Sequence, residues 1–147
     1  MFRRSVKRTR DGRYVLHLSA FERDLLRSLP EQMNELLARD DPSLVRLFPP
    51  AYTDDPEKDA EFRRLMREDL VDRRRQGLAV FERTVDATEL TEDELGAWLR
   101  AVNDVRLVLG TQLGVSEDAD PPITPEYQVY HYLSVLAEQM VEALAGW

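Results

Sequence analysis

The sequence predicts a mainly α fold: a single-domain helical bundle of about five helical segments with an N-terminal β-hairpin. Apolar residues recur at spacings of three and four over most of the chain, which is typical of amphipathic helices. Three Ser/Thr-x-x-Glu segments stand before or within these stretches, and this pattern is typical of helix starts. Residues 1–18 differ, because apolar and polar side chains alternate there around an Asp-Gly pair.

A chain of 147 residues fits one domain, so we expect residues 1–147 to fold as a unit, with the hairpin in 1–18 and the helical body in 19–147. Hydrophobic residues make up 43% of the chain, which is enough for one core. No apolar stretch approaches the roughly 20 residues of a membrane span. No apolar segment of the secretory type follows the charged N-terminus. These features predict a cytoplasmic protein that does not contact a membrane.

The predicted hairpin has its first strand in residues 2–8 and its second strand in residues 13–18. Asp11 and Gly12 are expected to form a type I′ turn, because both central positions of that turn need a positive φ that this pair tolerates. An isolated hairpin is marginally stable in water, so one of its faces must pack on the helices. The second strand offers an apolar face at period two: Tyr14, Leu16 and Leu18.

The first helix is expected to begin at the Ser19-x-x-Glu22 capping box. Pro30 interrupts its apolar stripe, and residues 28–31 resemble a second capping box, so we expect a kink or a restart there. Residues 43–48 are predicted to form one short helical turn before two prolines.

Three further helical segments follow. The first covers roughly residues 57–85, although the polar run 73–77 breaks its apolar stripe. The next begins after the capping box at Thr91 and ends near Gly114. An acidic loop is expected over residues 115–122. Thr124 and Pro125 then place a cap and an N1 proline before the last helix, which ends near residue 145.

The residue types argue against catalysis and against bound groups. The chain has no cysteine and only two histidines, His17 and His131, so a zinc site and thiol chemistry are not expected. We find no Gly-rich phosphate loop and no nucleophile beside a plausible base. We therefore expect no cofactor, no metal and no enzymatic activity.

The charge distribution marks the hairpin as a candidate binding surface. The net charge of the chain is −8, yet residues 1–13 contain only one acid, Asp11. Two readings stay open: direct nucleic-acid binding, because a two-stranded ribbon can enter a major groove, or charged strand edges that prevent pairing with other chains. The basic residues concerned are Arg3, Arg4, Lys7, Arg8, Arg10 and Arg13.

Arg73, Arg74 and Arg75 fall where the apolar stripe of the second helical region should continue. One interpretation is a solvated helix face whose aliphatic stems cover apolar surface. The other is a docking patch for an acidic partner.

A polar group within an apolar helix is the second candidate, and it consists of Asn103, Asp104 and Arg106. The helix is apolar on nearly every side from Val105 to Leu109, so Arg106 is expected to be buried. A buried guanidinium needs an acceptor, and Asp104 faces elsewhere on the helix, so the partner should come from another helix. Two interpretations remain open for Arg106. It forms either a structural ion pair or part of a pocket for a ligand or a partner.

Three stretches together resemble a known family. They are SLVRLFPPAY at 43–52, WLRAVNDVRLVLG at 98–110 and YQVYHYL at 127–133. Their order and spacing resemble an actinobacterial family of formerly unknown function, whose genes commonly lie beside those of the Clp protease adaptor ClpS and a cysteine-biosynthesis cluster. The family includes the oxidation-sensing regulators called AosR, in which a cysteine pair supplies the switch. The resemblance implies a transcription-related regulator, but this chain lacks cysteine and therefore departs from that mechanism.

The leading hypothesis is a non-enzymatic regulator that binds a protein of the transcription machinery, such as RNA polymerase or a sigma factor. The acidic body makes direct DNA binding through the hairpin the weaker alternative. A small-molecule or enzymatic pocket around Arg106 is the third hypothesis. A homodimer is compatible with an apolar patch formed by Trp147 and the last helix.

Overall fold

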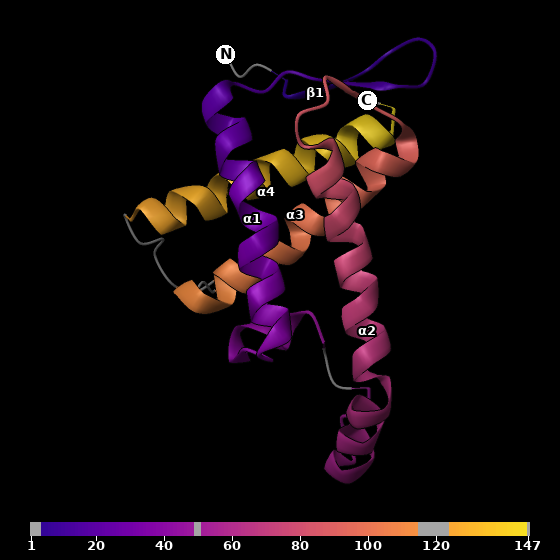
Figure 1. Cartoon of the computed structure of the whole chain (residues 1–147), viewed down its shortest axis with the longest axis vertical. Coiled ribbons are helices and arrows are strands. Elements are labelled where there is room, and N and C mark those ends of the chain that lie inside the picture. The colour runs from indigo at the N-terminus through magenta and orange to yellow at the C-terminus, as the bar shows by residue number, and fades with distance from the viewer. Residues whose placement is uncertain (1–3, 49–50, 115–123, 147) are drawn as a thin grey trace.

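The computed structural model describes residues 4–48, 51–114 and 124–146, and their arrangement is shown in Figure 1. The mainly α fold with an N-terminal hairpin is confirmed in these residues. Arg3, Trp147 and the expected acidic loop at 115–122 lie outside them. In chain order, the elements are β1 (Val6–Arg8), β2 (Tyr14–Leu16), α1 (Ala20–Ala38), the 3₁₀ helix η1 (Pro42–Arg46), α2 (Pro56–Thr84), β3 (Glu89–Leu90), α3 (Glu92–Leu113) and α4 (Pro125–Leu144).

The hairpin belongs to a three-stranded antiparallel sheet of order β1-β2-β3, and the third strand was not predicted. Val6 pairs with Leu16, and Tyr14 pairs with both Arg8 and Leu90. Tyr14 and Leu16 are buried, as their period-two spacing predicts. A two-residue strand such as β3 carries too little periodicity to be recognised in a sequence.

The expected type I′ turn is wrong. Gly12 has a φ of 82°, but Asp11 is not among the residues with positive φ. The backbone N–H of Thr9 instead donates to Arg13 O at 2.8 Å, and that of Gly12 donates to Thr9 O at 3.2 Å. This longer connection needs positive φ only at its glycine, so it relieves Asp11 of the strained conformation.

Helix α1 runs through Pro30 without the expected restart. The capping box at Ser19 and Glu22 forms, but the one expected at residues 28–31 does not. Ser28 Oγ instead donates to Leu25 O at 2.6 Å. Pro30 itself is buried. Packing of this apolar face therefore offsets the hydrogen bond that an interior proline removes. The other buried residues of the helix are Leu26, Leu29, Met33 and Leu37.

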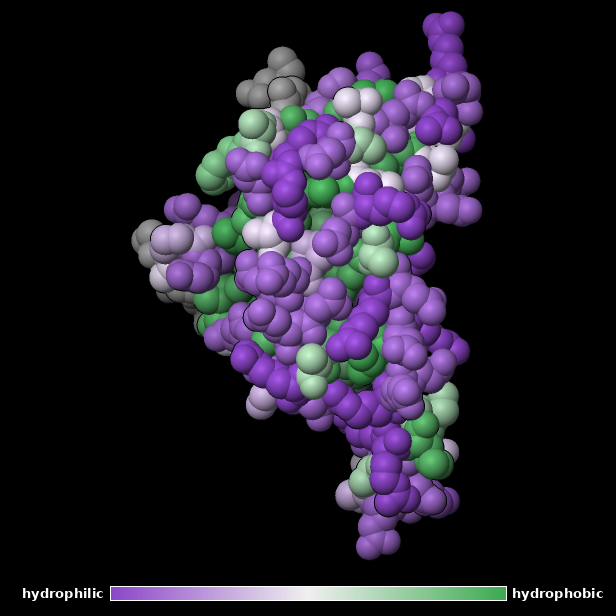
Figure 2. Space-filling view, viewed as in Figure 1, coloured by the Kyte–Doolittle hydropathy of each residue, from purple (hydrophilic) through white to green (hydrophobic). Residues whose placement is uncertain are grey.

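Helix α2 has 29 residues and is continuous through the polar run at 73–77. Its buried residues, Val71, Leu78, Phe81 and Thr84, all lie in its second half. The first half projects from the body of the molecule (Figure 1). The space-filling view in Figure 2 shows some apolar surface on this projection among polar residues. Leu65 in this half is 70% exposed.

Helix α3 is central, because it contacts α2, α4 and η1. It begins with the predicted capping box of Thr91 and Glu94 and ends at Gly114, whose φ of 66° is the left-handed conformation expected of a C-cap glycine. Its side chains Leu95, Trp98 and Val102 are fully buried.

Helix α4 begins as predicted, with Thr124 as its cap and Pro125 in its first turn. Its buried face, formed by Leu133, Leu136 and Met140 among others, joins the same core. Across the described ranges, no helix combines the length and the hydropathy that crossing a bilayer requires.

A hydrogen bond inside the core joins α2 to α3. Trp98 Nε1–H donates to Thr84 Oγ1 at 2.6 Å, and the Trp98 ring packs edge-on against Phe81 with 4.7 Å between centroids. The hydroxyl of Thr84 in turn donates to Val80 O at 2.7 Å. The indole N–H is therefore satisfied although Trp98 is fully buried.

We predict that Thr84→Val lowers the free energy of unfolding by about 1–3 kcal/mol, because it leaves the buried indole N–H without an acceptor. The same substitution in a Trp98→Phe background should cost less, since that donor is then absent. Urea denaturation followed by circular dichroism measures both. Equal costs in the two backgrounds would contradict the role of this hydrogen bond.

Candidate functional site

The described residues place one buried carboxylate, that of Asp104, between α2 and α3. Asp104 is only 5% exposed. Arg74 Nη1 donates to its Oδ1 at 2.7 Å, and Arg74 Nη2 donates to Leu47 O at 3.2 Å. The guanidinium also lies 5.9 Å from the centroid of the Phe48 ring. One arginine of α2 thus joins α3 and the segment around η1.

Burial raises the pKa of Asp104 above its ordinary value of 3.8, because the interior disfavours the charged carboxylate. Arg74 and, more weakly, Arg100 act in the opposite direction, since their positive charges favour the ionised form. Desolvation is the larger effect. The pKa of Asp104 is therefore set by burial, which raises it, and by two arginines, which lower it.

The three consecutive arginines of α2 do not act as one patch. Arg74 points inward to Asp104 and is one-third exposed. Arg73 is exposed and pairs with Asp69 at 3.2 Å one turn earlier on the same helix. Arg75 is exposed. The solvated-face interpretation fits Arg73 and Arg75, whereas Arg74 belongs to the packing between the helices.

The expectation for Arg106 is corrected in two respects. Arg106 is half-buried, and its Nη2 donates at 2.7 Å to Asn103 Oδ1, on the same helix and not on another. Its Nε is buried without a hydrogen-bond partner among the described residues. Asp104 forms the ion pair between helices that was expected of Arg106. A signal for this was present, because Asp104 continues the spacing of the buried Ala97, Ala101 and Val108.

The basic hairpin is partly committed to the fold. Arg13 forms an ion pair with Glu89 and so joins β2 to β3. The guanidinium of Arg8 lies against Gly146, near the end of the described chain. Three further basic residues of the hairpin are exposed: Arg4, Lys7 and Arg10.

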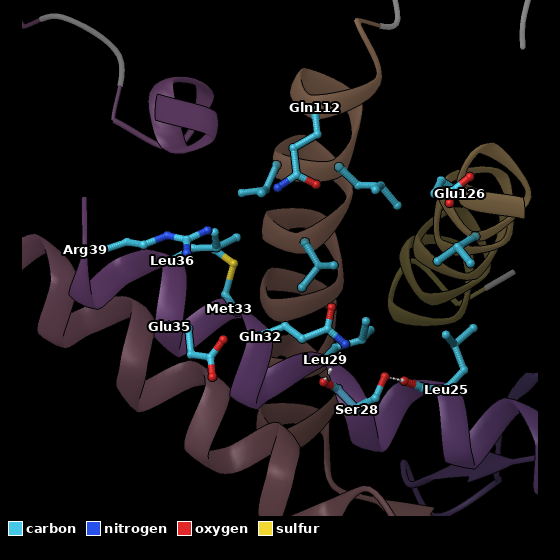
Figure 3. Close-up of a pocket in the computed structure, with 14 residues that line it drawn as sticks. Leu25, Ser28, Leu29, Gln32, Met33, Glu35, Leu36, Arg39, Gln112 and Glu126 are labelled. Carbon is cyan, nitrogen blue, oxygen red and sulfur yellow. Dashed lines mark hydrogen bonds between the residues drawn. The ribbon is translucent and has the colours of Figure 1, made fainter. Parts of the chain in front are cut away.

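Sequence reasoning did not single out the largest cavity that we describe, an apolar groove between α1, α3 and α4 of about 420 Å³. Figure 3 shows Gln32 of α1, Gln112 of α3 and Glu126 of α4 among the residues that line it. The apolar residues that line it follow the same helical spacing as core residues. Periodicity therefore does not distinguish a groove between helices from a filled core. The apolar lining is Leu25, Leu29, Met33, Leu36, Val105, Val108, Leu109 and Val129.

The three stretches 43–52, 98–110 and 127–133 meet at Gly110. A Cβ on this residue would lie 3.0 Å from Tyr130 Cε2 and 3.1 Å from Arg46 Nη1, which is closer than real Cβ contacts normally are. The absence of a side chain at Gly110 therefore lets the Tyr130 ring and the Arg46 guanidinium pack closely against α3, and a larger residue would displace them by a few tenths of an ångström. In the described part of the chain, no group of three or more His, Asp or Glu side chains could hold a metal ion.

These residues define a helical domain with a buried ion pair on one side of α3 and an apolar groove bordered by the same helix. The model of a family described as a domain of unknown function, DUF2017, matches residues 3–144, and the chain belongs to that family.

Curated relatives are about one third identical to this chain over the matched residues. A protein of Mycobacterium leprae named "Putative oxidative stress regulator AosR" is 35% identical over 129 residues, which cover 71% of this chain and 59% of the relative. The "Oxidative stress regulator AosR" proteins of Mycobacterium bovis and Mycobacterium tuberculosis are 33% identical, with coverages of 72% and 59%. The chain thus spans about three fifths of the length of these relatives. No solved structure matches it.

We predict that the carboxyl of Asp104 titrates above 3.8, and that Arg74→Gln raises its pKa further by removing the charge that opposes desolvation. The folded state binds the proton of the Asp104 carboxyl more tightly than the unfolded state does. Protonated Asp104 therefore makes its full contribution to the free energy of unfolding below pH 3.8. That contribution is lost as the pH rises through the raised pKa.

Carbon-13 NMR of the Asp104 carboxyl measures its pKa directly. The difference between the pH–stability profiles of the native chain and Asp104→Asn isolates its contribution from other acids. A titration at or below the ordinary value would contradict the burial that the structure gives this side chain.

Proposed function

We propose that this chain is a cytoplasmic, non-enzymatic regulatory protein, related to transcription, that acts through contacts with another protein. The observation that carries the proposal is its similarity to relatives named oxidative stress regulators, which covers 71–72% of the chain. The chain contains no cysteine, so a thiol switch within it is not part of the proposal.

The apolar groove between α1, α3 and α4 supports the choice of a protein partner. Its half-buried wall residues, such as Leu36 and Val129, offer apolar contacts of the kind that receive an amphipathic helix. The carboxylates Glu35 and Glu126 stand in its lining, and the guanidinium of Arg39 is already held by Asp41 at 3.1 Å. These features favour an amphipathic helix with basic residues beside its apolar face, and we propose that RNA polymerase or a sigma factor supplies it.

A pull-down with the full chain as bait, offered RNA polymerase and its sigma factors, tests the proposal. We expect capture above that of a charge-matched control protein. Gln32→Arg and Gln112→Arg should each weaken capture, because they add positive charge to a groove that we propose receives a basic helix. Gln76→Arg, an identical change at an exposed position of α2, should not.

Two results would argue against this proposal. If RNA polymerase and its sigma factors are not enriched over the charge-matched control, they are excluded as partners. Equal weakening by Gln76→Arg would show that net charge, and not the groove, governs capture.

Direct nucleic-acid binding through the hairpin is a second candidate, supported by the exposed side chains of Lys7, Arg8 and Arg10. Replacing all three with Glu should abolish retardation of DNA in a gel at low salt, since phosphate contacts dominate such binding. Arg13 is left intact because it pairs with Glu89. If the unmodified chain retards no DNA, this candidate is excluded.

A further inference from the structure

A second cavity, of about 330 Å³, lies between α2 and α3 on the side of the buried ion pair. Three arginines and one aspartate line it, whereas the whole chain carries a net charge of −8. The site is therefore a local concentration of positive charge in a concave place, where the field of several charges adds. Its lining is Leu70, Arg73, Arg74, Gly77, Leu78, Arg100, Ala101 and Asp104.

The one carboxylate that lines the cavity, that of Asp104, is already paired with Arg74. Asp104 accepts a hydrogen bond from Arg74 at 2.7 Å and is buried, so it has little capacity to neutralise further charge. Arg100 acts on Asp104 only through space. Arg73 is paired with Asp69, but both side chains are largely exposed, and such pairs contribute little. Two guanidinium groups thus border the cavity with weakly compensated charge.

The wall formed by α2 is open at Gly77. A Cβ added to this residue would meet nothing within 4 Å, so the glycine is not required by any close contact in the fold. Glycine in a helix interior costs about 1 kcal/mol relative to alanine. Here it leaves free space beside the two arginines, and that space would be reduced by any larger side chain.

We propose that this cavity binds a small organic anion, whose carboxylate or phosphate oxygens are held by Arg73 and Arg100. The planar guanidinium group offers two parallel N–H donors that match the geometry of both oxyanions. The volume exceeds that of a bare oxyanion and falls in the range of small-molecule sites. Leu70, Leu78 and Ala101 contact the carbon portion of the ligand.

The proposal does not depend on the regulatory function. It assigns a ligand class to a cavity between α2 and α3, which is separate from the protein-binding groove between α1, α3 and α4. Since Arg74 borders the cavity and also contacts Leu47 O and Asp104, a bound anion also lies beside the side chain that joins α2 to α3 and η1.

Isothermal titration calorimetry of the full chain, with citrate and pyrophosphate as separate probes at constant ionic strength, tests the site. We expect at least one probe to bind with a stoichiometry of one, and the preferred probe distinguishes a carboxylate ligand from a phosphate ligand. Arg73→Gln and Arg100→Gln should each weaken binding about tenfold, as expected for the loss of a charge-assisted hydrogen bond. Arg75→Gln removes the same formal charge from an exposed position outside the cavity and should leave affinity unchanged.

Gly77→Leu supplies an independent test, because it reduces the free space without changing any charge. We expect it to weaken binding while the helical circular dichroism spectrum is retained. The proposal is overturned if neither probe binds, if Arg75→Gln weakens binding as much as Arg100→Gln, or if Gly77→Leu leaves the affinity intact. Binding of a short oligo-glutamate peptide, with no binding of either small anion, would assign the cavity to a protein partner and also overturn it.

Discussion

The carboxylate of Asp104 imposes the constraint around which α2, α3 and η1 are arranged. A buried charge is costly unless it is paired and hydrogen-bonded. Arg74 offsets part of this cost through its hydrogen bond to Asp104, and it also donates from Nη2 to Leu47 O, while its guanidinium lies near the Phe48 ring. Replacing such a pair with apolar residues is often neutral in other proteins, but removing one partner is strongly destabilising. We infer that the pair selects one arrangement of the three elements.

The apolar core supplies most of the stability around this ion pair. Helix α3 contributes residues to two separate cavities, one on each of two faces. Asp104 faces α2, whereas its neighbour Val105 lines the groove formed with α1 and α4. Successive helical residues point about 100° apart, so adjacent positions can serve separate surfaces. Gly110, further along α3, allows Tyr130 and Arg46 to approach closely. The three stretches that resemble the family therefore meet on the helix that divides the two cavities.

Local signals in the sequence were sufficient for most of the fold. Capping residues such as Ser19, Thr91 and Thr124 begin the helices as predicted, because each cap satisfies backbone donors within its own turn. Two outcomes that these local signals did not predict depend on long-range effects. The packing of its buried face keeps α1 helical through Pro30. Arg13 pairs with Glu89, which lies 76 residues further along the chain.

The candidate sites were less accessible to prediction than the fold. The run 103–106 was recognised as unusual, but periodicity could not show whether Asp104 or Arg106 would find a partner on another helix. The alternating faces of α2 separate Arg74 from Arg73 and Arg75, a distinction that only the tertiary structure makes. Both cavities lie between helices, and the spacing of apolar residues along a helix does not show where space remains between it and its neighbour.

A double-mutant cycle on Arg74 and Asp104 measures the constraint most directly. The free energies of unfolding of Arg74→Met, Asp104→Asn and the double variant give the coupling energy of the pair. We predict a coupling of about 1–3 kcal/mol, as expected for contacting charges in one network. The same cycle on the exposed pair Arg73 and Asp69 should give less than about 1 kcal/mol. Additive effects at Arg74 and Asp104 would contradict a central role for this ion pair.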